Sequence, residues 1–446
     1  MLFSLTNPEV AIMMMGIFLF AVLLGFPIAF TLMAMGLGFG YYAYFDPTKM
    51  EHLFDNRIFQ LFVQNTYTVM DNNVLTAVPL FLFMGYLVER AGIVAKLFFA
   101  IRLASHKLPA SMAVAALITC TLFSTATGII GAVVTLMGLL AWPAMVKAGY
   151  DKKFASGIIC SGGCLGILIP PSIMLIVYSV IAQLSPLRLF AAAIFPGLML
   201  AGLYIGYAVT RAWLNPSIAP KPAAEEIPPT AVIMKEVLVS FLPLFSLIIL
   251  VLGTILAGIA TPAEAAAVGA FGALVLSYFY KTLKWKNFKE SVFLTAKTTA
   301  MIMWLFIGSW TFASVFSYLG GHEVFEHFFK SLNLQPWQFL VITQIIIFLL
   351  GWPLEWTEIL IIFVPIFLPL VEFFGVNPYF FAMLIALNLQ TSFLTPPMAM
   401  SAYYLKGVQS KNVELMEIFR GIMPVLGIVI FAMVLMYLFP GIALWL

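Results

Sequence analysis

Charged residues are scarce in this chain. Of its 446 residues only 9% are Asp, Glu, Lys or Arg, whereas 63% are hydrophobic. Soluble domains carry about 25% charged and roughly 45–50% apolar residues, so the composition excludes a water-soluble globular protein. Apolar runs close to the roughly 20 residues that a bilayer requires alternate with short polar breaks. Because these runs are continuous rather than alternating, we expect an all-α polytopic membrane protein and not a barrel.

Several functional signatures are missing as well. There is no GxxxxGK[ST] motif, so we expect no ATP hydrolysis by this chain. The 22 Lys and Arg residues stand against 19 Asp and Glu, and no tract is basic enough to predict a nucleic-acid partner. None of the four histidines lies in the middle of an apolar run, and the three cysteines suit packing. We therefore predict no enzyme activity and no resident cofactor.

The two halves of the chain share a pattern of proline and glycine at an offset of 226 residues. A proline-rich linker at 214–232 separates the halves. The loop at 147–153 holds three lysines, whereas its counterpart at 372–378 holds none, and the excess of Lys and Arg in cytoplasmic loops therefore predicts inverted halves. The identical pairs are Pro143 and Pro369, Gly149 and Gly375, Phe154 and Phe380, Leu168 and Leu394, Pro170 and Pro396, Pro171 and Pro397, and Tyr178 and Tyr404.

Each half also carries two adjacent prolines inside an apolar run. Such a pair removes two backbone donors and leaves free carbonyls, which a membrane tolerates only where they face protein, water or an ion. The apolar runs at 109–147 and 336–373 are too long for one crossing and end on the side where they began, so we predict two re-entrant hairpins. Inverted repeats with interrupted helices are typical of secondary transporters, whose site lies at the repeat interface.

This pattern predicts five parts of the chain. The hairpins and broken helices would form a transport domain, and the remaining helices would form a scaffold. The parts are scaffold helices with an interfacial arm at 1–108, the first hairpin and broken helix at 109–186, scaffold helices around the linker at 187–335, the second hairpin and broken helix at 336–410, and a C-terminal helix at 411–446.

Oxygen-rich turns and helix ends are the predicted binding groups. Hydroxyls and free carbonyls at the two hairpin tips and two helix breaks suit sodium, and half-helix N-termini suit an anionic substrate. The candidate substrate-binding residues are Ser172, Glu355 and Asn388. Glu355 and Glu358 are the acids expected to lie deepest. Either they function within the membrane or they are hydrated at an external mouth, and the sequence leaves both interpretations open.

Three motifs together resemble a known family. They are Gly166-Ile-Leu-Ile-Pro-Pro-Ser172, Thr395-Pro-Pro397 and Thr261-Pro-Ala-Glu264-Ala-Ala-Ala. The chain resembles the large membrane subunit of the tripartite ATP-independent periplasmic (TRAP) transporters. The resemblance implies an elevator-type fold in the bacterial inner membrane and sodium-coupled import of a small carboxylate. It also implies two partners, a periplasmic solute-binding protein and a small four-helix membrane subunit.

The resemblance also implies site residues. For the first sodium site the matching positions are Thr127, Gly166, Ile169 and Pro171; for the second they are Thr357, Ser392, Thr395 and Pro397. At the first hairpin tip, where the family commonly has Ser-Gly-Ser, the chain has Thr127, Gly128 and Ile129. Either the Ile129 carbonyl replaces the missing hydroxyl or the sodium site is altered. Trp356 stands where a small residue is more common, which predicts a narrower or aromatic pocket.

Alternative functions make different demands on the sequence. An ion channel would require a continuous polar pore lining, and no such stripe is present. A stand-alone sodium–carboxylate symporter of related architecture would share every feature above. It would differ only in working without a binding protein.

Overall fold

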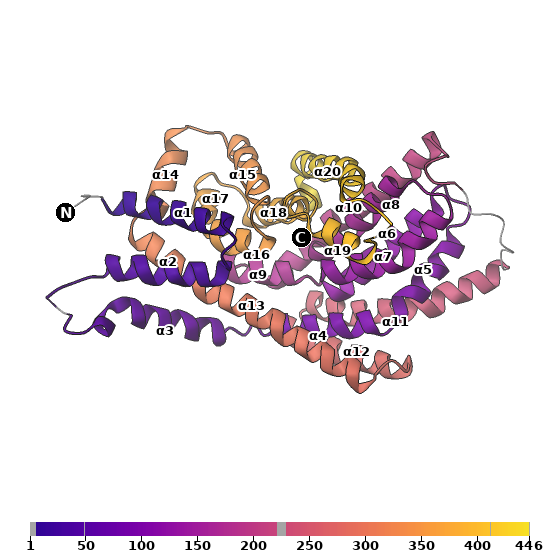
Figure 1. The fold of residues 1–446 in the computed structure, drawn as a ribbon, viewed down its shortest axis with the longest axis horizontal. Coiled ribbons are helices and arrows are strands. Elements are labelled where there is room, and N and C mark those ends of the chain that lie inside the picture. Colours follow the sequence, from indigo (N-terminus) through magenta and orange to yellow (C-terminus); the bar gives the residue numbers. More distant parts are fainter. Residues whose placement is uncertain (1–5, 49, 221–228, 411, 446) are drawn as a thin grey trace.

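The computed structural model describes residues 6–48, 50–220, 229–410 and 412–445, which fold into helices joined by short turns (Figure 1). No strand occurs within these ranges, so the predicted all-α class is confirmed for them. Part of the predicted linker, residues 221–228, lies outside the described residues.

The first half contains ten α-helices and two short 3-10 turns. The helices are α1 Asn7–Leu23, α2 Ile28–Ala43, α3 Arg57–Met70, α4 Ala77–Arg90, α5 Ile93–Ala104, α6 Ser111–Thr127, α7 Ile130–Lys147, α8 Lys152–Cys164, α9 Ile173–Ala182 and α10 Pro186–Leu214, and the 3-10 turns are η1 Leu53–Asp55 and η2 Leu165–Ile167.

The second half is also helical, with a π-helix in one helix and a break between two others. Its elements are α11 Thr230–Leu256, α12 Pro262–Phe279, α13 Trp285–Tyr318, α14 Gly321–Ser331, α15 Pro336–Leu350, α16 Trp356–Glu358, the π-helix η3 Ile359–Phe363, α17 Val364–Phe373, α18 Pro378–Ser392, α19 Met400–Val408, α20 Leu415–Leu438 and η4 Pro440–Ile442.

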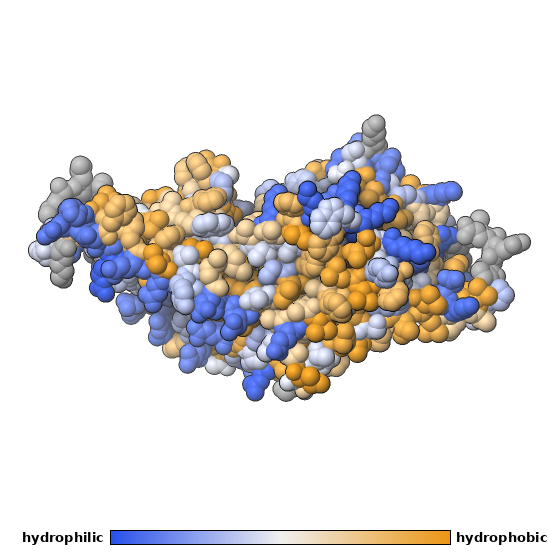
Figure 2. All heavy atoms as spheres, turned by 90° about the horizontal axis from the view of Figure 1, so that it is seen from below, coloured by the Kyte–Doolittle hydropathy of each residue, from blue (hydrophilic) through white to orange (hydrophobic). Residues whose placement is uncertain are grey.

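Length and composition are those of a membrane protein. Among the described residues, seven helices are long and apolar enough to cross a bilayer, and α4 with α5 forms a further span bent by 63°. Five more apolar helices have 10–17 residues. Figure 2 shows a surface with broad hydrophobic areas between hydrophilic patches. Large apolar side chains as exposed as Ile259, at 77%, require lipid around them.

The internal repeat is visible in the element bounds. Shifted by 226 positions, the ends of α7 coincide with the start of α16 and the end of α17. The turns that follow use the same chemistry, since Gly149 and Gly375 both have positive φ, at 83° and 63°. The next helices begin at equivalent N-caps, because the Asp151 side chain accepts from the Phe154 N–H and the Asn377 side chain accepts from the Phe380 N–H.

Both predicted hairpins and both predicted helix breaks are present. Helices α6 and α7 form the first hairpin, and α15 with the segment α16–η3–α17 forms the second. The first broken helix is α8 and η2, then α9; the second is α18, then α19. The Pro170–Pro171 and Pro396–Pro397 bonds, both cis, lie in the two breaks.

The halves are interlocked through the first hairpin and the second broken helix. A Cβ added at Gly131 of α7 would lie 2.8 Å from the Tyr404 ring of α19, and one at Gly138 would lie 2.8 Å from Val408. The Gln409 side-chain N–H donates to the Gly138 carbonyl at 2.8 Å. Small residues therefore allow α7 and α19 to pack closely, as is usual between membrane helices.

The long helix α13 organises the other side of the molecule, where it packs against α2, α3 and α4 (Figure 1). Helix α12 packs against α4 and begins at a capping box. There the Thr261 N–H donates to Glu264 Oε2 at 2.7 Å, and the Glu264 N–H donates to Thr261 Oγ1 at 3.3 Å. Glu264 therefore has a structural role at the start of this helix.

Candidate functional site

The first hairpin turns through a glycine. Helix α6 ends at Thr127, Gly128 has a φ of 62°, and Ile129 is extended before α7 begins. The Gly128 N–H returns to the Ser124 carbonyl at 2.8 Å, and the Thr127 hydroxyl donates to the Phe123 carbonyl at 3.0 Å. The buried Ser124 hydroxyl has no hydrogen-bond partner among the described residues, which leaves an oxygen free for a ligand.

The tip of this hairpin rests on the first helix break. A Cβ at Gly166 would lie 3.1 Å from the Ser124 Cβ, and one at Gly128 would lie 3.8 Å from the Ile173 nitrogen at the start of α9. Within the break, the Ser172 hydroxyl donates to the Ile167 carbonyl at 2.5 Å. Ile169 and Pro171 are buried. The first hairpin tip therefore meets the broken helix of its own half.

The second hairpin contains a π-helix in its returning arm. Pro365 has no N–H and cannot satisfy the carbonyl four residues earlier, at Ile361. That carbonyl accepts instead from the Ser309 hydroxyl of α13, at 3.0 Å. The scaffold helix thus compensates for an interruption in the hairpin, as buried backbone groups require.

The second tip also meets its own break. A Cβ at Gly351 would lie 2.9 Å from the Ser392 Cβ. The Ser392 hydroxyl donates to the Leu389 carbonyl and the Thr395 hydroxyl to the Thr391 carbonyl, both at 2.8 Å, so their oxygen lone pairs remain free. The buried Thr357 hydroxyl has no partner among the described residues.

The two breaks differ in exposure. Pro170 and Pro171 are buried, whereas Pro396 and Pro397 are exposed. The Pro397 carbonyl accepts from the Tyr403 hydroxyl at 3.0 Å and is therefore already engaged. Pro397 was predicted for the second sodium site, but its carbonyl is bonded to Tyr403 and not to the second hairpin tip.

A cavity of about 310 Å³ lies between the two tips, the two breaks and the helices α4 and α13. Its size suits a small organic molecule. Its lining residues are Leu82 and Tyr86 of α4, Gly128, Ile129, Ile130 and Gly131 of the first hairpin, Ile167 and Ile173 of the first break, Thr298, Met301 and Ile302 of α13, Glu355, Trp356 and Thr357 of the second hairpin, and Phe393, Met400 and Tyr404 of the second break and α19.

The first residues of four helical segments line this cavity. They are Ile130 of α7, Ile173 of α9, Trp356 of the segment α16–η3–α17 and Met400 of α19. The first turn of a helix has free N–H groups and carries the positive end of the helix dipole. Free N–H groups therefore face a cavity whose lining has no cationic side chain, and Glu355 is its one formally charged residue.

The predicted substrate residues are divided by the structure. Glu355 lines the cavity, whereas Ser172 and Asn388 are fully buried and do not. The Asn388 side chain donates two hydrogen bonds to Gln344 of α15, at 2.7 and 2.8 Å, and so joins the second hairpin to its broken helix. Trp356 gives the cavity the aromatic character that its position predicted.

Sequence reasoning did not select one group that the structure places here. Ser124 contacts Gly166 but was absent from the predicted sodium residues, although it lies one turn before Gly128. Glu358, one turn into the second hairpin's returning arm, is 6% exposed and its Oε2 has no partner among the described residues. Glu358 is one of the two acids that the sequence predicted to lie deepest, and its burial confirms that prediction.

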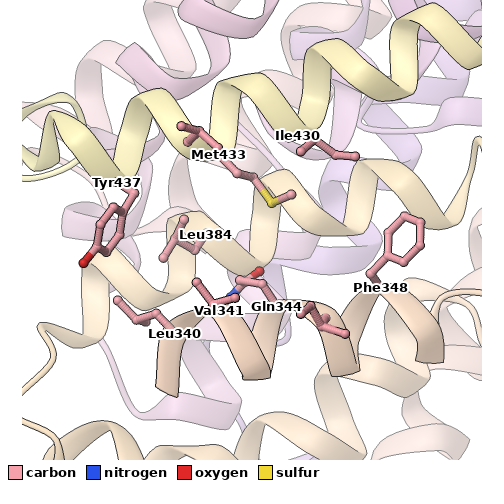
Figure 3. Close-up of a pocket in the computed structure, with 10 residues that line it drawn as sticks. Leu340, Val341, Gln344, Phe348, Leu384, Ile430, Met433 and Tyr437 are labelled. Carbon is pink, nitrogen blue, oxygen red and sulfur yellow. The ribbon is translucent and has the colours of Figure 1, made fainter. Parts of the chain in front are cut away.

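A separate groove has a different lining from the cavity between the hairpin tips. It has about 350 Å³ between α15, α18 and α20, and Figure 3 shows apolar side chains on every wall around the single amide of Gln344. Val341 and Ile345 beside it are about half exposed, at 47% and 54%, so the groove faces lipid. It lacks the converging helix starts of the first cavity.

The fold and the cavity between the two hairpin tips define a polytopic membrane transporter. Two solved membrane transporters share the fold: YdaH of Alcanivorax borkumensis, with a TM-score of 0.60 at 15% identity over 96% of this chain and 97% of that one, and MtrF of Neisseria gonorrhoeae, with 0.55 at 14% over 97% and 94%. More specifically, the family profile described as the DctM component of the tripartite ATP-independent periplasmic transporter matches residues 15–442. The chain belongs to this family.

Two relatives of this chain are named as transporters of organic acids. The C4-dicarboxylate TRAP transporter large permease protein of Pseudomonas aeruginosa is 29% identical over 85% of this chain and 87% of its own length. The sialic acid TRAP transporter large permease protein of Vibrio cholerae is 30% identical over 83% of this chain and 85% of its own length. The family resemblance drawn from the sequence is confirmed.

Proposed function

We propose that this chain is the permease that carries a small carboxylate-bearing solute, coupled to sodium, across the bacterial inner membrane. The observation that carries the proposal is the cavity whose walls include the first residues of four helical segments. Helix N-termini stabilise anions through free N–H groups and the helix dipole. A carboxylate bound there would need no arginine, in agreement with the absence of a cationic side chain from the lining.

The one charged residue in the cavity lining supports a cation as the coupling ion. Glu355 would repel an anionic solute across a cavity of about 310 Å³, and a bound cation would offset that repulsion. The free oxygens at the two tips, Ser124 Oγ and Thr357 Oγ1, suit sodium because hydroxyls and carbonyls coordinate it without adding charge. The first site would hold sodium between Ser124, Thr127 and Gly166, and the second between Thr357, Ser392 and Thr395.

The hairpins and broken helices are the proposed moving part of the molecule. The hairpins and broken helices interlock across the two halves, whereas α4 and α13 pack against each other and line the cavity from outside this group. We propose an elevator-type motion of the former against the latter. A small four-helix membrane subunit and a periplasmic binding protein would complete the assembly, in keeping with the tripartite family.

Uptake into proteoliposomes tests this function. The vesicles would hold this chain, its small membrane subunit and the cognate binding protein, and uptake of dicarboxylates and sialic acid would be measured with and without an inward sodium gradient. Uptake that requires both sodium and the binding protein is expected. Uptake by this chain alone would favour the stand-alone symporter, and uptake that ignores the sodium gradient would refute the coupling.

A matched pair of glutamate variants tests the electrostatic argument. Glu355→Gln removes the carboxylate that attracts the cation, so we expect half-maximal uptake at a higher sodium concentration. Glu372→Gln makes the same change at an exposed position outside the cavity and is expected to leave the sodium dependence unchanged. Equal sodium curves for the wild type and both variants would remove Glu355 from the coupling argument.

A further inference from the structure

A second polar cavity lies away from the transport cavity, where α4 ends and α13 begins. It has about 590 Å³ and is lined by Arg90, Lys286, Lys289, Glu290, Phe293 and Leu294. None of these residues lines the transport cavity. The lining joins three cations and one carboxylate to two apolar side chains.

The positive charge of this cavity is not neutralised by its own acid. Arg90 Nη2 lies 3.4 Å from Glu290 Oε2, and Nη1 donates to Ser291 Oγ at 3.3 Å, so Glu290 is already paired. Neither Lys286 nor Lys289 forms an ion pair within the described part of the chain. Two ammonium groups are therefore available to an anion.

The N-terminus of α13 is a second feature that favours an anion in this cavity. The N-cap of α13 is Lys284, whose side chain makes no capping hydrogen bond, and the first turn has no acidic residue. Cations at a helix N-terminus are repelled by the helix dipole and leave the first N–H groups without acceptors. An anion bound beside Lys286 and Lys289 would relieve both conditions.

The surroundings indicate an anion with an apolar tail. Phe293 is 64% exposed, and the Lys289 Nζ lies 5.7 Å from the centre of its ring. Trp285 is 76% exposed, and Tyr278 and Phe279 at the end of α12 are 70% and 73% exposed. Exposed aromatic residues beside lysines are typical of the level where a membrane meets water. A soluble phosphate would use the lysines but not this apolar surface.

We propose that this cavity binds the phosphate head group of an anionic phospholipid. Lys286 and Lys289 contact the phosphate, Arg90 stays anchored to α13, and an acyl chain lies along Phe293 and Leu294. Basic pockets between membrane helices on the lysine-rich side bind such head groups. The bound lipid holds the end of α4 against the start of α13, two helices that also line the transport cavity.

Lipid titration of the purified protein tests this inference. The melting temperature of the detergent-solubilised chain would be followed as phosphatidylglycerol or phosphatidylethanolamine of the same acyl composition is added, and retained lipid would be counted by native mass spectrometry. We expect phosphatidylglycerol alone to raise the melting temperature and to be retained. The double variant K286Q/K289Q should need about 30-fold more phosphatidylglycerol, since each lysine near a membrane surface is worth about 1 kcal/mol.

Controls separate the sources of the effect. Lys235→Gln removes an exposed lysine of α11 that does not line the cavity and should bind phosphatidylglycerol like the wild type. Inorganic phosphate at the same concentration should have no effect. Equal responses to the two lipids in the wild type would overturn the proposal, as would wild-type binding by the double variant or a full response to inorganic phosphate. The wild-type comparison stands even if the double variant does not fold.

Discussion

The crossing of α8 and α20 has almost no free space, which makes it sensitive to a single methyl group. A Cβ at Gly421 would lie 2.8 Å from the Lys153 carbonyl carbon and 3.2 Å from the Gly157 nitrogen, against backbone that cannot rotate away. Carbon atoms pack at about 3.5–4.0 Å, so Gly421→Ala must separate the helices by roughly 1 Å. Overpacking of this kind costs about 1–3 kcal/mol.

The same helix supplies the control. Gly427 of α20 has no atom within 4 Å of an added Cβ, so Gly427→Ala introduces the same methyl group without a clash. It should stabilise the helix by up to about 1 kcal/mol, because alanine is the better helix former. The two variants should therefore differ by roughly 1–4 kcal/mol in the free energy of unfolding.

Thermal unfolding in detergent, followed by tryptophan fluorescence, measures that difference. The Gly421→Ala variant should melt below the wild type and Gly427→Ala at or above it. Proteoliposome uptake would show whether loosening this crossing, which holds the first half of a broken helix, also slows transport. If Gly421→Ala melts as high as Gly427→Ala, the reasoning from close packing is refuted.

Three further predictions concern the site and α14. Gly85→Ala should slow uptake severalfold and also lower the melting temperature, because its Cβ would lie 2.7 Å from the Thr127 carbonyl oxygen at the hairpin tip; unchanged uptake would refute this. Thr395→Ala should raise the sodium concentration for half-maximal uptake about fivefold, the effect of one lost oxygen ligand, while Thr395→Ser should not; an unchanged sodium curve would remove that ligand. Burial lowers the pKa of His322 in α14, outside the membrane spans. The unfolded chain takes up a proton near pH 6.5 and the native chain only at lower pH, so melting temperature should fall below that pH in the wild type and fall less in His322→Phe; equal profiles would contradict this.

Much of the fold was predictable because the informative residues act locally. Paired prolines interrupt a helix wherever they occur, and a glycine such as Gly128 ends one, so the hairpins and breaks followed from the sequence. The capping box of α12 was predictable for the same reason, since its partners are three residues apart.

Contacts between distant residues were not predictable in this way. The bond from Asn388 to Gln344 joins two helices, and nothing in the spacing of apolar residues encodes it. The same is true of the hydrogen bond that the Ser309 hydroxyl donates to the Ile361 carbonyl. The bend between α4 and α5 and the close packing of α7 on α19 also depend on tertiary geometry. For that reason the candidate list contained Asn388, which points away from the cavity, and omitted Ser124.

The packing of α7 against α19 has a consequence for how the chain could have arisen and how it can be divided. Because the first hairpin is covered by the second broken helix, neither half is a complete folding unit. The first half alone would expose Gly131 and Gly138 to lipid, and the second half alone would expose the face of α19 that covers them. Two polypeptides made by cutting at the proline-rich connection would instead complement one another, much as two copies of a single-repeat ancestor would have had to pair before they were fused.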